Sequence, residues 1–350
     1  MSARKLKSKM LLKVARAATL TAITPFALAA PNITSSDYDD TGNTLTLFGS
    51  GFGNPGFKFA FLESVDSSRL SSGGRITEYS YESIWDQYGT AWAKPLVPKG
   101  MEGPAPQTNN QLYYGGPGKA DNSYIKPVEE QESRALYVSW NYRPSMDPNQ
   151  AGGSNKFIRI WDDHSGTHTR ISWTQMHLTY VAKDVAGSDG VSWSNWSGNV
   201  NEWNLLEVFV DSDAGTIGAW TNGKRVHNIT NYTKSPISDG LGVRLLGFDA
   251  SVETPYVSME TYIDNLYVSN TPAKVVLSTK PTWDTSILST SVAQLPIKWT
   301  DSTITLALDQ NNFTEDFYIY VLDENRLVNR EGYPLSGCAK CPLSPTLTIE

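Results

Sequence analysis

The chain has 350 residues, of which 39% are hydrophobic, and its formal net charge at pH 7 is −7. This acidity disfavours nucleic acid as a partner, because proteins that bind the phosphate backbone present an excess of positive charge. After residue 29, no apolar run approaches the roughly 20 residues that a membrane-spanning helix needs, so we expect no membrane span.

Residues 1–29 are typical of a secretory signal peptide. Six basic residues precede an apolar stretch, Ala17–Ala29, which ends in the small-x-small sequence Ala27-Leu28-Ala29. The alternative is an N-terminal membrane anchor, which the short apolar length and Pro25 disfavour. We therefore expect a secreted or cell-surface protein. Cleavage would change the net charge from −7 to −13, since the six cations Arg4, Lys5, Lys7, Lys9, Lys13 and Arg16 leave without any acid.

The first predicted strand after this segment lies within "TGNTLTLFGSGFGNPG", residues 41–56. Leu45 and Leu47 alternate with threonines, which is typical of a half-buried strand. Gly49, Gly51 and Gly53 then interrupt the run and indicate a sharp turn or bulge. Too few strands follow at once to complete a small domain.

Most of the later chain predicts an all-β sandwich. The segment 85–134 is rich in Pro, Gly and Asn and indicates long loops with short edge strands. Short runs rich in Val, Ile, Tyr and Trp then alternate with turn residues. Within residues 205–226, "DSDAG" and "NG" mark two turns on either side of a strand, which predicts an antiparallel meander.

Two groups of polar residues are candidates for chemistry. Glu207 and Asp211 of "LLEVFVD" would share one strand face, although a strand-end acid and a turn acid are the favoured interpretation. If "RISWTQMHLTY" is one continuous strand, Trp173, Gln175 and His177 lie on one face. Arg159 shares a face of "FIRIW" with Trp161.

Tryptophan side chains are candidates for sugar binding, because the apolar faces of sugar rings stack on indoles. Trp193 and Trp196 lie in the turn-rich "VSWSNWSGN" and are expected to be exposed, while burial in the core is the alternative for any of them. The predicted ligand-binding residues are Trp161, Trp173, Trp193 and Trp196.

Near the C-terminus, Cys338 and Cys341 are expected to form a short-loop disulfide after export. A zinc site would need further ligands, and a thioredoxin-like role would need a strand followed by a helix around the two cysteines.

Residues 202–226, "EWNLLEVFVDSDAGTIGAWTNGKRV", and the closing "TYIDNLYVSN" resemble the concanavalin A-like jelly roll, the fold of laminin-G-like modules, lectins, glycoside hydrolases and polysaccharide lyases. The resemblance implies a jelly roll over residues 57–271. Glu63 and Asp264 occupy places comparable to the structural calcium ligands of such modules. The three-acid pattern of laminarinase-type glycoside hydrolases is incomplete.

"Gln175-Met176-His177" is similar to the Gln-x-His strand of jelly-roll alginate lyases. That similarity implies that Gln175 and Arg159 neutralise a uronate carboxylate while His177 removes the C5 proton. The companion "R-x-E-L-R" and "Y-x-K-x-G-x-Y" motifs of those lyases are missing here.

The two ends of the chain resemble two halves of an immunoglobulin-like IPT/TIG domain. "GNTLTLFGSGFG" matches its opening strands, and Ala273, Val275, Trp299 and Ile304 fit its later ones. The usual final glycine is replaced near Asn325. We predict a discontinuous immunoglobulin-like β-sandwich, residues 30–56 and 272–337, that contains the inserted jelly-roll β-sandwich and is followed by a tail, residues 338–350. Two independent incomplete pieces are the alternative.

The sequence therefore favours a secreted carbohydrate-binding or adhesion protein that recognises an extracellular polysaccharide or a cell-surface glycan. A polysaccharide lyase that cleaves a uronate polymer by β-elimination and a structural surface or filament protein are the alternatives. Whether the protein is an enzyme and which sugar it binds stay open, and structural calcium is the one cofactor expected.

Overall fold

The computed structural model describes residues 29–63 (except 40 and 42), 85–88, 97–105, 111–115, 125–127, 133–150, 155–162, 169–182, 185, 187, 189–235, 240–249, 254–308 and 316–335. Almost every regular element in them is a β-strand, which confirms the all-β prediction. Two short 3-10 turns, η1 (Thr254–Tyr256) and η2 (Thr285–Thr290), accompany the strands. No helix in these ranges is long and apolar enough to cross a membrane. The predicted signal peptide, apart from Ala29, and the predicted Cys338–Cys341 disulfide lie outside the described residues.

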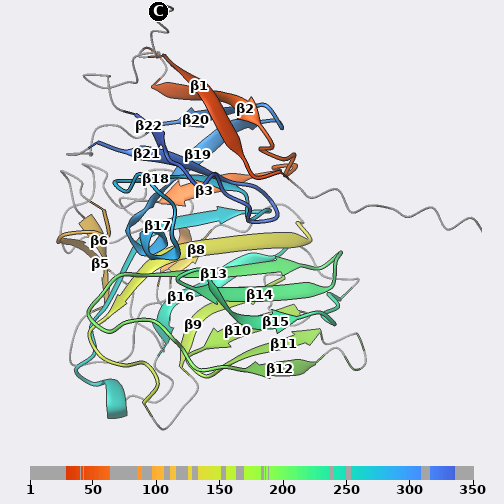
Figure 1. Cartoon of the computed structure of the whole chain (residues 1–350). Coiled ribbons are helices and arrows are strands. Elements are labelled where there is room, and N and C mark those ends of the chain that lie inside the picture. The colour runs from red at the N-terminus through yellow and green to blue at the C-terminus, as the bar shows by residue number, and fades with distance from the viewer. Residues whose placement is uncertain are drawn as a thin grey trace, which may run out of the picture.

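A smaller sheet unites both ends of the chain, as the red and blue strands at the top of Figure 1 show. Its order is β1-β2-β20-β19-β18-β21-β22, with every pair antiparallel. Leu45 and Leu47 of β2 lie opposite Leu306 and Ile304 of β20, so the predicted pairing between these distant segments is confirmed. The bounds are β1 Asn32–Asp39, β2 Thr44–Ser50, β18 Lys274–Ser278, β19 Val292–Trp299, β20 Thr303–Ala307, β21 Tyr318–Leu322 and β22 Tyr333–Pro334.

Strand β19 turns this sheet back on itself. Its first residues pair with β18 and its last residues pair with β20, with an irregular register between Pro296 and Lys298. Proline has no N–H to donate, and a bulge bends a strand, so this is where β19 can pass from one layer to the other. Leu45 and Leu47 consequently face Val275 and Leu277 of β18 in one apolar core.

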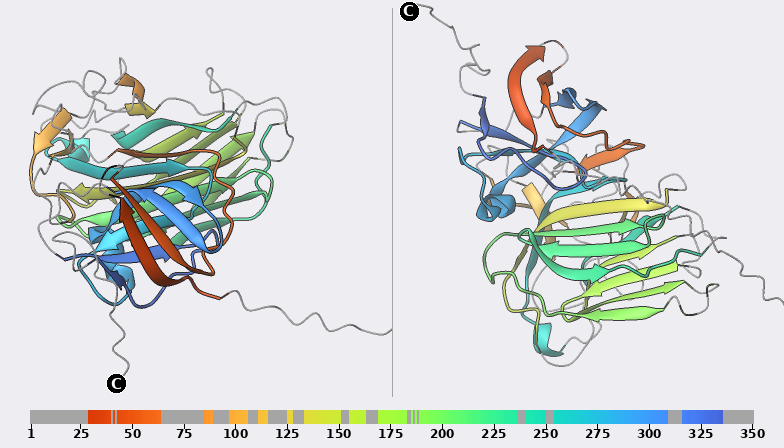
Figure 2. Two further views of the ribbon diagram at one scale, coloured as in Figure 1. Left: turned by 90° about the horizontal axis from the view of Figure 1, so that it is seen from above. Right: turned by 45° about the vertical axis from the view of Figure 1, so that its right-hand side comes forward.

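A larger sandwich fills the middle of the chain, with its two layers visible in Figure 2. The eight-stranded sheet has the order β15-β14-β13-β8-β17-β6-β5, with β3 also paired to β17, and the five-stranded sheet has the order β12-β11-β10-β9-β16. The first sheet contains β3 Ala60–Glu63, β5 Val97–Gly100, β6 Gln111–Gly115, β8 Ala135–Pro144, β13 Asn204–Asp211, β14 Thr216–Thr221, β15 Lys224–Ile229 and β17 Thr261–Ser269. The second contains β9 Lys156–Trp161, β10 Thr169–Thr174, β11 His177–Ala182, β12 Gly190–Trp193 and β16 Gly242–Asp249.

The predicted meander is present as β13, β14 and β15. Asn222 and Gly223 join β14 to β15 with φ angles of 51° and 74°, and Gly215 before β14 has φ 68°. Two successive left-handed residues match the right-handed twist of a tight hairpin, which is why "NG" is a reliable signal. In the segment expected to be loops, β5 and β6 lie at the sheet edge, and β4 (Trp85–Tyr88) pairs with β7 (Ile125–Pro127).

The two chain segments that connect the sandwiches lie side by side. Lys58 N donates to Asn270 Oδ1 at 2.8 Å, and Asn270 Nδ2 donates to Gly56 O at 3.0 Å. Adjacent termini are what an inserted domain needs if its host is to remain intact. The immunoglobulin-like kind of the smaller sandwich and the domain bounds stay predictions.

Candidate functional site

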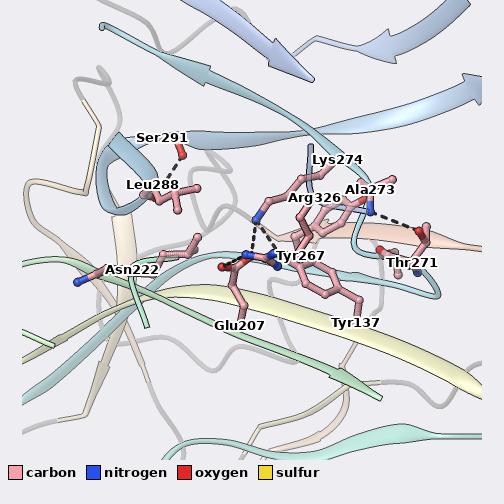
Figure 3. Close-up of polar contacts among 12 residues, drawn as sticks. Tyr137, Glu207, Asn222, Tyr267, Thr271, Ala273, Lys274, Leu288, Ser291 and Arg326 are labelled. Atoms are coloured by element: carbon pink, nitrogen blue, oxygen red, sulfur yellow. Dashed lines mark hydrogen bonds and ion pairs between the residues drawn. The ribbon is translucent and has the colours of Figure 1, made fainter. Parts of the chain in front are cut away.

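Glu207 lies in the interface between the two sandwiches and not on an open sheet face. Its side chain is 0% exposed. It receives hydrogen bonds from Tyr137 Oη at 2.5 Å, Lys274 Nζ at 3.2 Å, and Arg326 Nη1 and Nη2 at 3.1 and 2.8 Å (Figure 3). Glu207 and Tyr137 belong to the larger sandwich, while Lys274 and Arg326 belong to strands and turns of the smaller one. We refer to these four residues as the interface cluster.

The neighbouring positive charges keep the Glu207 carboxylate ionised. Burial on its own would raise the pKa of Glu207, but the charges of Arg326 and Lys274 and the hydrogen bonds outweigh it and lower that pKa well below its usual range. Burial lowers the pKa of Lys274 and raises that of Tyr137. A carboxylate satisfied by three partners and closed to solvent is structural, but Glu207 lies in the middle of β13 and is not the strand-end acid that was expected. Asp211 is the expected turn acid, since it accepts the N–H groups of Asp213 and Ala214 in the following turn.

The predicted continuous strand "RISWTQMHLTY" is wrong, because it folds into a hairpin. β10 ends at Thr174 and β11 begins at His177. The Thr174 hydroxyl accepts from the N–H groups of Met176 and His177 at 3.2 and 2.9 Å and donates to His177 O at 2.8 Å. Threonine side chains close turns in this way, competing with strand hydrogen bonds. Trp173, Gln175 and His177 therefore do not share one strand face.

Gln175 holds loops together at the end of this hairpin. It is 1% exposed. Its Oε1 accepts from Asn155 N at 3.0 Å, its N–H donates to Asn155 O at 3.3 Å, and its carbonyl accepts from Trp196 N at 2.6 Å. A buried amide engaged with two neighbouring loops is not placed to reach a polysaccharide, so the structure contradicts the predicted catalytic position of Gln175.

Arg159 and His177 do lie together, on the outward face of the five-stranded sheet. An open pocket of about 190 Å³ there is lined by residues of β9, β10 and β11. Inward-pointing side chains of the same strands, such as Ile158, Ile171 and Leu178, belong to the core. We call this surface the β9–β11 face. Its described lining residues are Lys156, Arg159, Arg170, Ser172, Thr174, His177, Thr179 and Val181.

The β9–β11 face combines positive charge with hydroxyl groups. Lys156, Arg159 and Arg170 supply three cations, and no acid is among the described lining residues, although the chain as a whole is acidic. Guanidinium groups bind carboxylates and sulfates through two parallel hydrogen bonds, while serine and threonine hydroxyls can both donate and accept. Arg170, Ser172 and Thr179 were not predicted from the sequence. The signal that was available is the alternation of polar with apolar residues along β10 and β11, which places these three side chains on the outward side.

Trp193 and His177 form the aromatic edge of this face. Trp193 is 67% exposed, and its ring centroid lies 4.8 Å from that of His177, which is its partner in the pairing of β11 with β12. Burial, and then the charge of Lys156, lowers the pKa of His177. Trp161 lies two residues from Arg159 on the same outward side and is partly exposed.

Trp173 and Trp196, by contrast, belong to the apolar core. They are 1% and 5% exposed. Trp173 packs edge-on against Trp140 and Phe157 with centroids 6.1 and 5.7 Å apart, and Trp196 packs against Tyr142. The expected exposure of Trp196 and the expected outward position of Trp173 are therefore wrong, because filling a wide sandwich requires large side chains.

The two residues predicted as calcium ligands lie on neighbouring strands of the eight-stranded sheet. Glu63 pairs with Leu266 of β17, two residues beyond Asp264. Asp264 and Asn265 form a bulge: Asn265 has φ 48°, and Asp264 Oδ1 accepts from the N–H of Asn265 at 2.7 Å. The described residues contain no group of three or more His, Cys, Asp or Glu side chains that could hold a metal ion. Asp264 thus has a structural task of its own, and calcium binding stays a prediction.

No family model and no curated protein matches the sequence. Among solved structures, the chain is similar to the binding domain of Paraclostridial Mosquitocidal Protein 1, with 8% identity, 68% of this chain and 59% of that chain covered, and a TM-score of 0.36. It is similar to domain 4 of an extracellular arabinanase from Geobacillus stearothermophilus, solved with arabinotriose (14% identity, 69% of this chain and 94% of that chain covered, TM-score 0.34). It is also similar to an alginate lyase solved with an alginate tetrasaccharide (13% identity, 60% of this chain and 96% of that chain covered, TM-score 0.42).

Proposed function

We propose that the protein is a secreted glycan-binding or adhesion protein whose β9–β11 face binds an extracellular polysaccharide or cell-surface glycan that carries carboxylate or sulfate groups. The observation that supports this proposal most directly is the open pocket with three cations and no acid among its described lining residues, on an otherwise acidic chain. Anionic groups of a glycan would pair with Arg159, Arg170 and Lys156.

The aromatic edge supports the same proposal. Trp193 offers an exposed indole face beside the pocket, where the apolar side of a sugar ring can stack. The hydroxyl groups of Ser172 and Thr179 line the same pocket as the cations and can exchange hydrogen bonds with sugar hydroxyls. A featureless sheet face would instead have favoured the structural alternative.

Binding to a panel of immobilised polysaccharides tests this function. We expect retention of alginate, polygalacturonate or dextran sulfate over neutral dextran, with weaker retention as salt rises, because exposed charge pairs are screened. Arg159→Ala and Trp193→Ala should each weaken retention, whereas Arg225→Ala, an exposed arginine on β15 of the other sheet, should not. Equal retention of dextran and dextran sulfate would contradict an anionic ligand.

A lyase activity is the second candidate, because Arg159 and His177 line the same pocket. A histidine whose pKa is lowered is neutral at pH 7 and can accept a proton. Of the three residues to which the lyase similarity assigns a role, Arg159 and His177 line this pocket, whereas Gln175 is not among its described lining residues. Absorbance of the unsaturated product on alginate or polygalacturonate tests it; His177→Ala should abolish any such signal.

A further inference from the structure

The short edge strand β12 carries Trp193 and is contacted by a histidine on each of its two sides. Outside, Trp193 lies against His177 of β11. Inside, the neighbouring residue Ser192 forms a hydrogen bond of 3.0 Å between its Oγ and Nδ1 of His227. Neighbouring residues of a strand point to opposite faces, so two adjacent positions of β12 are held from opposite sides.

His227 joins the edges of the two sheets of the larger sandwich. It lies on β15, the last strand of the eight-stranded sheet, while β12 is the last strand of the five-stranded sheet. These two edge strands are in contact. β12 is four residues long and, among the described strands, pairs with β11 alone, so the hydrogen bond between Ser192 and His227 ties its inner side to the other sheet.

We propose that His227 is a positioning residue of the β9–β11 face, which holds β12 through Ser192 and thereby keeps Trp193 beside His177 at the edge of the pocket. The effect on glycan binding rests on the proposed function. The position of Trp193 does not, because it is a property of the protein without ligand. His227 touches no ligand in this arrangement and acts through β12.

The surroundings of His227 make its neutral form the one that holds β12. Its side chain is 1% exposed, it packs edge-on against Trp173 at 6.2 Å, and its Nε2 is buried without a hydrogen-bond partner among the described residues. Burial, and secondly the charge of His177, lowers the pKa of His227 from 6.5 to about 4. His177 itself lines the same pocket as Lys156, Arg159 and Arg170, so each new proton adds positive charge to a group of cations.

Acidification should therefore loosen β12. Protonated His227 would place an uncompensated charge between the two sheets, and local opening of β12 would relieve it. As a consequence, Trp193 should move away from His177 and glycan binding should weaken as the pH falls. The change is expected between about pH 6.5 and pH 4, the usual and the lowered pKa of His227.

The indole N–H spectrum of the ¹⁵N-labelled full chain, recorded without ligand, tests the position of Trp193 directly. Its signal is assigned as the one lost in Trp193→Phe. His227→Phe removes the bond to Ser192, and His227→Gln keeps a polar group there that does not titrate near neutral pH. Should His227→Phe fail to fold, Ser192→Ala removes the same bond from the other side.

We expect His227→Phe and Ser192→Ala to move the Trp193 signal at pH 7 and to weaken binding to dextran sulfate about tenfold, since a partly buried hydrogen bond is lost. His227→Gln should restore both and should bind with less loss at pH 5 than the unaltered chain. An unmoved Trp193 signal in Ser192→Ala, or equal acid sensitivity in His227→Gln, would overturn the inference. A Trp193 signal that responds while no variant binds glycan would overturn the proposed function alone.

Discussion

Replacing Glu207 by glutamine should be among the most damaging single-atom changes in this protein. The substitution keeps the shape of the side chain and one acceptor oxygen but removes the negative charge. Lys274 Nζ and the Arg326 guanidinium then remain as two cations in the sandwich interface, with side chains only 2% and 19% exposed. Removing one partner of a buried ion pair costs about 3–5 kcal/mol, because the other charge is left uncompensated.

We expect the lower end of this range, about 3 kcal/mol, because glutamine still accepts a hydrogen bond and Arg326 retains some access to water. The cation–π contact of Arg326 with Trp220, 4.3 Å from the ring centroid, also remains. At roughly 2–4 °C of melting temperature per kcal/mol for a chain of this size, the loss corresponds to a decrease of about 6–12 °C.

Thermal and urea unfolding of the purified chain, followed by circular dichroism, measure this loss. Glu202→Gln is the matched control, since Glu202 is an exposed acid just before β13 and its loss changes the net charge equally. The pair Glu207→Gln with Lys274→Met closes a double-mutant cycle and isolates the coupling between the two charges. A loss of less than about 1 kcal/mol, or one equal to that of Glu202→Gln, would refute the reasoning, because that is the worth of an exposed pair.

Four further predictions follow from the same structure. Arg326→Gly should destabilise the chain although it relieves the left-handed backbone at that position (φ 66°), because the guanidinium contacts with Glu207 are lost; a gain in melting temperature would contradict this. The free energy of unfolding should fall as the pH decreases from 6.5 to about 4, because His227 binds its proton more readily in the unfolded state than in the folded one. It should fall further below pH 4.5, because the lowered pKa of Glu207 likewise means that the unfolded state takes up its proton first. A free energy of unfolding that does not change with pH would refute both signs. Calcium should raise the melting temperature and Asp264→Ala should abolish the rise. Melting that does not respond to a chelator would argue against the predicted calcium site. Gly49→Ala should destabilise by about 1–3 kcal/mol, measured by urea unfolding, because a Cβ there would overlap the carbonyl oxygen of Asn32 and the ring of Phe52.

Local patterns in the sequence were sufficient for the fold class and for several turns. Alternation in "TLTLF" predicts β2 correctly, since a strand with one buried face must place apolar residues at every second position. The "NG" turn follows from the φ angles that two-residue hairpins need. The pairing of β2 with β20 was also predictable, because neither end of the chain has enough strands to enclose a core.

The functional face depended on features that spacing alone does not contain. Period-2 reasoning assigns Trp173, Gln175 and His177 to one face only if the strand is unbroken, and the hydroxyl of Thr174 breaks it. Arg326 has a left-handed backbone (φ 66°), which glycine adopts most easily, and its side chain reaches a carboxylate 119 residues away in the sequence. Which tryptophans are buried, which cations meet in one pocket and which histidine lies beneath β12 are all decided by contacts between distant strands. The sequence by itself determined the fold class and several strands and turns, because these follow from neighbouring residues. The tertiary structure decided the site, because it depends on which strands become neighbours.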